Sequence, residues 1–260
     1  MLLDVNARLT YTLPSVTDML LQIEVADLTD QRTASSDLQT SQTIHFARVA
    51  AEAGLGSRIW MRAGEGQFHC DYHCRVDADR PVPEIAALSQ VPPHLLPGDT
   101  VRYLMPSRFC PSDHFQAFVA AEFGSLDGGE RIAAIRDWIN GAFSYVPGSS
   151  NAQTTALDTF VQRRGVCRDC AHVMIALARA SSIPARFASV YAPDVTPQDF
   201  HAVAEVFLDG AWHLVDATGM TSADTIARIG VGMDAAEVAF LTAFGPIDLV
   251  EHEVSVDRVR

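Results

Sequence analysis

The chain has 260 residues, 48% of them hydrophobic and 20% charged, which is the composition of a folded protein with one large or two ordinary domains. Its formal net charge of −13 argues against nucleic acid or an anionic membrane surface as the main partner, because both attract clustered lysine and arginine. No apolar stretch is long enough to span a bilayer, and the first residues lack the pattern of a secretory signal. With five cysteines and no such signal, we expect a cytoplasmic protein with reduced thiols.

The first part of the chain predicts antiparallel β-structure. Short alternating segments separated by turn residues are typical of a sandwich or barrel. Strands are expected at residues 9–13, 20–25, 43–46 and 57–62. A proline-rich segment at residues 91–99 then interrupts regular structure. We therefore predict a β-rich N-terminal domain over residues 1–98 and a second domain over residues 99–260.

Beyond residue 99 the spacing of apolar residues changes to that of helices. Helices are expected at residues 114–123, 130–143, 156–164 and 167–180, with Asp113 as the N-cap of the first and Gly165 ending the third. Strands are expected next, at residues 183–192, 200–208 and 211–217. A helical segment at residues 235–243 and a last strand at residues 250–259 complete the chain. The second domain is therefore expected to combine helices with an antiparallel sheet.

Cys167 is the most informative residue because it begins the helix expected at residues 167–180. A thiol in the first turn of a helix feels the positive end of the helix dipole, which favours the nucleophilic thiolate. The backbone N–H of Cys167 is also a natural donor to an oxyanion formed there. The sequence does not identify a second donor.

The turn at residues 209–210 allows a geometric prediction for two further polar residues. A two-residue Asp-Gly turn pairs Leu208 with Ala211, and this register makes His201 and Asp216 diagonal neighbours on one face of the sheet. Such partners lie about 7–8 Å apart at the backbone, which an imidazole and a carboxylate can bridge. A slip of one residue would place them on opposite faces. A thiolate, an imidazole and an orienting carboxylate are the groups that nucleophilic acyl transfer needs.

Three blocks of sequence resemble the motifs of the bacterial transglutaminase-like superfamily, in the same order. The blocks are residues 165–169 with 182–186, residues 200–206, and residues 212–218. The resemblance covers about residues 107–245, and the N-terminal half resembles the β-rich domain that precedes the core in many bacterial members. It implies an α+β fold with a papain-like core, in which helices pack on an antiparallel sheet. It also implies a catalytic triad of Cys167 as nucleophile, His201 as base and Asp216 as orienting carboxylate.

The resemblance implies a thiol-dependent amide-bond hydrolase or acyltransferase, because the superfamily includes peptidases, amidases and crosslinking enzymes. We expect a cysteine peptidase or amidase that forms a thioester on Cys167, acts on a peptide or other amide, and uses no cofactor. The alternatives are a protein-crosslinking transglutaminase, a non-catalytic binding module on the same fold, and a redox protein using Cys167 and Cys170. The substrate and the oligomeric state stay open. Specificity is expected from the loops at residues 144–155 and 191–199, with the N-terminal domain as a further contributor.

Three other polar residues near Cys167 are expected to be structural. Asp169 fits the acid of a first helical turn, Cys170 fits a core position, and His172 is treated as structural. The sequence departs from the superfamily pattern at two positions. Cys170 stands where an aromatic residue is common, and Ala217 stands where proline is frequent. Neither replacement removes a catalytic atom.

A cluster of His69, Cys70, His73 and Cys74 suggests zinc at first sight. Strand alternation, however, places the two cysteines on one face and the two histidines on the other. One flat strand cannot easily supply both pairs to a tetrahedral ion, so no metal is expected here.

Overall fold

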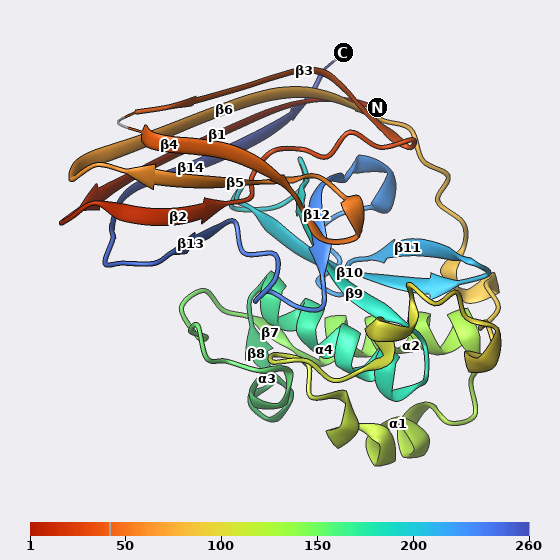
Figure 1. Cartoon of the computed structure of the whole chain (residues 1–260). Coiled ribbons are helices and arrows are strands. Elements are labelled where there is room, and N and C mark those ends of the chain that lie inside the picture. Colours follow the sequence, from red (N-terminus) through yellow and green to blue (C-terminus); the bar gives the residue numbers. More distant parts are fainter. Residues whose placement is uncertain (42, 260) are drawn as a thin grey trace.

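The computed structural model describes residues 1–41 and 43–259, and combines a β-sandwich with a third sheet covered by helices (Figure 1). One sandwich sheet has the order β14-β1-β6-β3, with β1 (Leu2–Leu13), β3 (Gln31–Thr40), β6 (Gly66–Ala78) and β14 (Asp248–Arg258). The other has the order β13-β2-β5-β4, with β2 (Thr17–Leu21), β4 (Thr43–Ala50), β5 (Ser57–Ala63) and β13 (Leu241–Ala243). The α+β architecture and the β-rich N-terminal region are those that the sequence predicts.

The sandwich is held together by the alternating apolar residues of its strands. Leu9, Met61 and Phe68 are buried between the two sheets with their neighbours of the same faces. Strand β3 was not expected from the sequence, and its burial pattern shows why, since most of its side chains are exposed. A polar edge strand lacks the apolar alternation by which strands are recognised.

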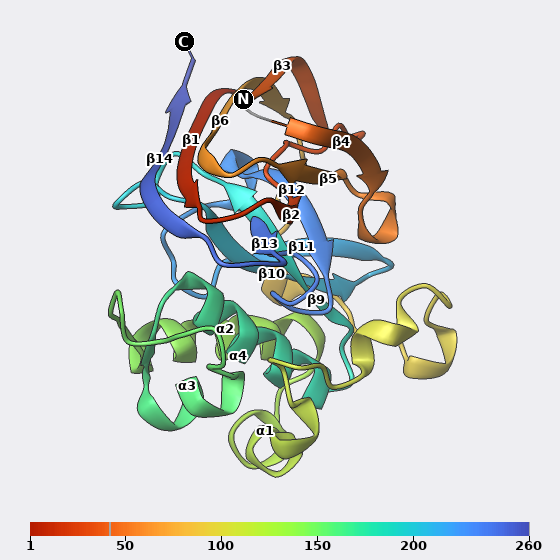
Figure 2. The same ribbon diagram turned by 60° about the vertical axis from the view of Figure 1, so that its left-hand side comes forward.

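The last two strands of the chain belong to the sandwich. Strand β14 pairs with β1, with Val256 opposite Val5, and the two strands lie side by side in Figure 2. Strand β13 pairs with β2, with Leu241 opposite Leu21. The division of the chain at residue 98 stays a prediction, but the segment from Leu241 onward hydrogen-bonds with N-terminal strands. The two ends of the chain therefore build the same pair of sheets.

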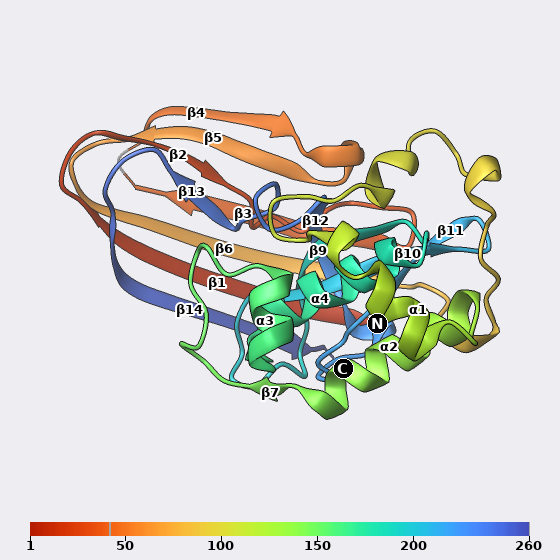
Figure 3. The ribbon, with the colours of Figure 1, turned by 90° about the horizontal axis from the view of Figure 1, so that it is seen from below.

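The third sheet carries the helices. Its order is β11-β10-β9-β12, with β9 (Ala185–Tyr191), β10 (His201–Leu208), β11 (Ala211–Val215) and β12 (Ala227–Gly232). The helices are α1 (Gln116–Phe123), α2 (Gly128–Ala142), α3 (Ala156–Gln162) and α4 (Cys167–Ala180), and they lie together on one side of the molecule (Figure 3). Helix α4 packs directly on β9 and β10 and is buried along most of its length, with Val173, Met174 and Leu177 fully enclosed. It is the central helix of this layer.

Three local expectations are wrong. Helix α1 has Phe115 as its N-cap and not Asp113, because residues 112–114 form a short 3₁₀ turn. Helix α3 ends at Arg163, whose φ of 56° is left-handed, and Gly165 lies beyond it in the two-residue strand β8 (Arg164–Gly165).

The third error is the helical segment expected at residues 235–243. The chain there forms a turn followed by β13. The Asp234 carboxylate accepts hydrogen bonds from the backbone N–H groups of Ala236, at 2.9 Å, and Phe109, at 2.8 Å. Side-chain bonds of this kind compete with a helix for the backbone donors. No helix within the described residues is both long and apolar enough to cross a membrane.

Candidate active site

The start of α4 is shaped by a close contact between Gly165 and Asp169. The Asp169 carboxylate accepts a hydrogen bond from the Val166 N–H at 2.9 Å and another from Arg168 Nη2 at 2.8 Å. A Cβ on Gly165 would lie 2.7 Å from the Cβ of Asp169, so a larger residue there would force one of them to move. Asp169 is the first-turn acid that the sequence predicts, and Cys167 begins the helix beside it.

His201 and Asp216 come together at the open end of the β10–β11 hairpin. Leu208 pairs with Ala211, as the two-residue turn predicts, and both turn residues at 209–210 have positive φ, 47° and 79°. His201 Nε2 lies 3.1 Å from Asp216 Oδ2 in the protein interior. The predicted register is confirmed, and it brings the imidazole and the carboxylate into hydrogen-bond contact.

The Asp216 carboxylate is fixed by the loop that follows it. Its Oδ1 accepts hydrogen bonds from the Thr218 backbone at 2.8 Å and the Thr218 hydroxyl at 2.7 Å, and its Oδ2 accepts one from the Thr221 N–H at 3.0 Å. Burial would raise the pKa of Asp216, but the hydrogen bonds from His201 and Thr218 outweigh burial and hold that pKa below its usual value. These roles of Thr218 and Thr221 were not predicted from the sequence. The available signal was a hydroxyl residue two positions after an aspartate, a common turn pattern.

His201 is 1% exposed and its charged form is favoured. Burial would lower the pKa of His201, but the hydrogen bond with Asp216 and the neighbouring Cys167 thiol outweigh it and raise that pKa to about 9. The second ring nitrogen, Nδ1, is buried and has no hydrogen-bond partner among the described residues. One ring nitrogen is thus engaged by the carboxylate, and the other is available to exchange a proton.

Tyr145 is a neighbour of Cys167 that the sequence does not predict. It belongs to β7 (Ser144–Tyr145), which pairs in parallel with β8, placing Tyr145 opposite Gly165. Burial and the Cys167 thiol beside it raise the pKa of the Tyr145 hydroxyl above its usual value. A strand of two residues leaves no periodic pattern, so the sequence could not have shown this proximity.

Cys167 and His201 line a cavity of about 490 Å³. Ala152 and Asp199 line it from the two loops that were expected to carry specificity. Much of the remaining wall comes from residues 235–242 and from His252 on β14, which the sequence did not predict. Its lining is mostly apolar and includes Phe109, Phe187, Phe200, Val238 and Phe240.

Two residues of α4 close to Cys167 are structural. Cys170 is 5% exposed, and burial raises the pKa of its thiol to about 12, which does not favour a redox role with Cys167. His172 is fully buried, stacks on Phe109 and lies tilted against Phe187, with ring centroids 5.2 Å apart in both cases. Burial lowers the pKa of His172 to about 3, so this ring is neutral.

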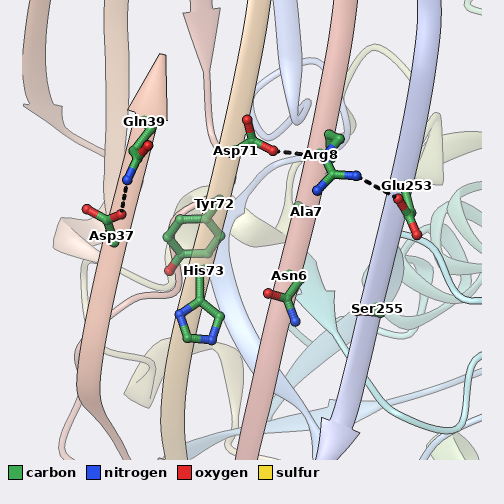
Figure 4. Close-up of a pocket in the computed structure, with 10 residues that line it drawn as sticks. All are labelled: Asn6, Ala7, Arg8, Asp37, Gln39, Asp71, Tyr72, His73, Glu253 and Ser255. Atoms are coloured by element: carbon green, nitrogen blue, oxygen red, sulfur yellow. Dashed lines mark hydrogen bonds and ion pairs between the residues drawn. The ribbon is translucent and has the colours of Figure 1, made fainter.

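A second hollow, of about 450 Å³, lies on the solvent face of the β14-β1-β6-β3 sheet (Figure 4). Figure 4 shows that its charged side chains contact one another, since Arg8 bonds to Asp71 at 2.9 Å and to Glu253 at 3.4 Å. Gln39 likewise donates to Asp37 at 2.8 Å. None of these residues lines the Cys167 cavity. The polar side chains of this hollow therefore bond to one another, and the hollow is separate from the candidate site.

The alternation predicted for the histidine and cysteine cluster on β6 is confirmed. Cys70 and Cys74 are buried in the sandwich core, while His69 and His73 face solvent. Within residues 1–41 and 43–259, no three histidine, cysteine, aspartate or glutamate side chains gather where they could hold a metal ion.

Comparisons with known proteins agree with this architecture. The family model of the transglutaminase-like superfamily matches residues 117–217, a segment that contains all three predicted site residues. The crystal structure of a putative cysteine protease from Cytophaga hutchinsonii is 33% identical, with a TM-score of 0.93, and the match covers 99% of this chain and 90% of that one. An uncharacterized protein of Mycobacterium leprae is 28% identical over 116 residues, which are 42% of this chain and 41% of that protein. The chain is therefore a member of the transglutaminase-like superfamily.

Proposed function

We propose that the protein is a cysteine peptidase or amidase in which Cys167, His201 and Asp216 act as a catalytic triad. The observation that carries this proposal is the buried His201–Asp216 hydrogen bond at a cavity that also exposes Cys167, the first residue of α4. A scaffold without catalysis has no need for an imidazole held charged inside the protein beside a thiol. The similarity to a putative cysteine protease over nearly the whole chain points in the same direction.

The chemistry follows from the positions of these groups. The Cys167 thiolate attacks the carbonyl carbon of an amide, and the charge that develops on the oxygen is met by the Cys167 N–H at the helix start. His201 delivers its proton to the leaving amine from Nδ1, while Asp216 holds Nε2 and keeps the ring oriented. A thioester on Cys167 remains. His201 then takes a proton from water, which attacks the thioester, releases the acid and restores the Cys167 thiolate beside a protonated His201.

Labelling with iodoacetamide tests the pairing of thiol and imidazole without knowledge of the substrate. We expect fast modification of Cys167, located by mass spectrometry, and a rate at least about tenfold lower in His201→Ala. His213→Ala is the matched control, because His213 lies on β11 of the same hairpin, bonds to the Leu208 carbonyl and does not line the cavity. Slow labelling that is indifferent to His201→Ala would overturn the proposal and favour the binding module.

The acyl acceptor is tested separately. With peptide substrates we expect an acyl group on Cys167 that hydroxylamine removes, and release of the free acid when water resolves the thioester. Incorporation of a labelled primary amine into protein glutamine, in preference to hydrolysis, would instead identify a crosslinking transglutaminase.

A further inference from the structure

One side of the Cys167 cavity is closed by three rings, Phe200, Phe240 and His252, which we call the aromatic wall. The rings of Phe200 and Phe240 stack with centroids 4.8 Å apart and planes within 10°. His252 presents its edge to both, at 5.5 Å and 5.6 Å. All three line the same cavity as Cys167. The wall is a packed cluster of aromatic rings beside the nucleophile.

The aromatic wall joins distant parts of the chain. Phe200 directly precedes His201 at the start of β10, Phe240 directly precedes β13, and His252 lies on β14. Because β13 and β14 are strands of the sandwich, the sandwich fixes two of the three rings relative to the catalytic histidine. The wall is thus part of the folded framework.

Another part of the cavity wall is held in place by two buried polar residues. Asp234, 1% exposed, accepts hydrogen bonds from the backbone N–H groups of Phe109 and Ala236. His172, fully buried, accepts one from the Ala235 N–H at 3.2 Å. Phe109, Ala235 and Ala236 all line the cavity. A cavity shaped before substrate arrives binds a matching group without the cost of ordering its walls.

Charge around the cavity narrows the choice of substrate further. Arg108 and Arg168 line it on the side of Phe109, with their guanidinium groups 4.8 Å and 6.0 Å from that ring. Arg168 is ion-paired with the buried Asp169 at 2.8 Å, whereas Arg108 has no ion-pair partner among the described residues, which leaves it as an uncompensated cation in the lining. A lysine or arginine side chain of a substrate would meet like charge here.

We propose that this cavity is a subsite for a large apolar side chain, aromatic above all, next to the amide that is cleaved in a peptide. The inference rests on the proposed function, because it takes the cavity at Cys167 as the substrate cavity. Its volume of about 490 Å³ lies within the range usual for ligand pockets, about 300–1,000 Å³. Contact with the aromatic wall supplies affinity, and the positive charge of Arg108 selects against basic side chains.

Protection of Cys167 from iodoacetamide tests the subsite. The ligands are the peptides acetyl-Ala-X-Ala-amide, with phenylalanine, alanine or lysine at X, and the measurement is the peptide concentration that halves the labelling rate. We expect the phenylalanine peptide to protect at a concentration at least about tenfold lower than the alanine peptide, and the lysine peptide to protect least. The ratio between peptides is taken within one protein preparation, so a change in thiol reactivity cancels.

Two variants and one control locate the effect. Phe240→Ala removes a ring of the wall, and Ala236→Trp fills the cavity from an exposed position without removing packing; both should bring the phenylalanine-to-alanine ratio close to one. Phe244→Ala is the matched control, because Phe244 is 62% exposed, packs on Trp60 and does not line the cavity. It should keep the ratio of the unmodified protein.

The outcomes separate this inference from the function on which it rests. If labelling of Cys167 depends on His201 but the peptides protect equally, the subsite is wrong and the proposed function stands. The subsite is also wrong if the preference for phenylalanine survives both Phe240→Ala and Ala236→Trp. If labelling is slow and independent of His201, the proposed function fails and the substrate assignment fails with it.

Discussion

His201 and Asp216 are 15 residues apart in sequence and meet at 3.1 Å, with the imidazole 1% exposed and the carboxylate anchored by the Thr218 and Thr221 backbone. The contact depends on the register of one hairpin, because a shift by one residue would turn the two side chains to opposite faces. A buried imidazole next to a fixed carboxylate has its orientation and its charge set before any substrate binds.

Replacing the carboxylate should remove the charge on the imidazole near neutral pH. In the unmodified protein we expect His201 to titrate at a pKa of about 9, measured by NMR of ¹³C-labelled histidine rings and assigned with His201→Gln. In Asp216→Asn that pKa should fall to its ordinary value or below it, because burial then dominates. An unchanged pKa in Asp216→Asn would show that another group holds the charge.

The same interaction makes stability depend on pH. Because the pKa of His201 is higher in the folded protein than its ordinary value of 6.5, protonation of His201 stabilises the fold. This contribution is fully present below about pH 6.5 and is lost as pH rises through about 9. Urea unfolding of the protein and of His201→Gln across this range should show a difference in free energy that shrinks toward alkaline pH. A difference that grows with pH would contradict the assignment.

Gly165→Ala should disturb the start of α4. The new methyl group would lie 2.7 Å from the Cβ of Asp169, and the resulting shift should cost about 1–3 kcal/mol of unfolding free energy and slow the labelling of Cys167. Gly141→Ala is the control, since a Cβ there has nothing within 4 Å and alanine is the better helix former. Equal stability of the two variants in urea would show that the loop before Cys167 adjusts freely.

Thr218→Val should loosen the carboxylate while keeping the shape of the side chain. The change removes the hydroxyl that donates to Asp216 Oδ1 at 2.7 Å but leaves the Thr218 backbone donor in place. We expect a loss of about 1 kcal/mol in stability and a rise in the pKa of Asp216, followed by NMR of its carboxyl carbon. If neither quantity changes, the hydroxyl has no part in holding the carboxylate.

Local patterns predicted the elements that carry the candidate site well. Helix α4 was found to the residue, because its apolar spacing is regular and Gly165 and Cys167 mark its start. The hairpin register followed from a two-residue turn whose residues adopt the positive φ that such turns require. These features depend on neighbours in the sequence, where propensity and turn chemistry act directly.

Long-range pairings could not be predicted in the same way. The polar strand β3 and the two-residue strand β7 have no apolar alternation, so both were missed, and Tyr145 was missed with β7. The helix expected at residues 235–243 is wrong because the Asp234 side chain hydrogen-bonds to the backbone N–H groups of Phe109 and Ala236. Phe240 and His252 reach the cavity through strands that pair with the N-terminal part of the chain, a relationship with no local signature.

Because β13 and β14 belong to the sandwich, the part of the chain after residue 98 is not expected to form a complete unit alone. A fragment that starts after residue 98 would keep Cys167, His201 and Asp216 but leave β14 without its partner β1 and β13 without β2. Two rings that line the Cys167 cavity would then lose their support, since Phe240 and His252 belong to that segment. The minimal unit that keeps the proposed substrate cavity is therefore expected to include both ends of the polypeptide, even though Cys167, His201 and Asp216 lie within 50 residues of one another.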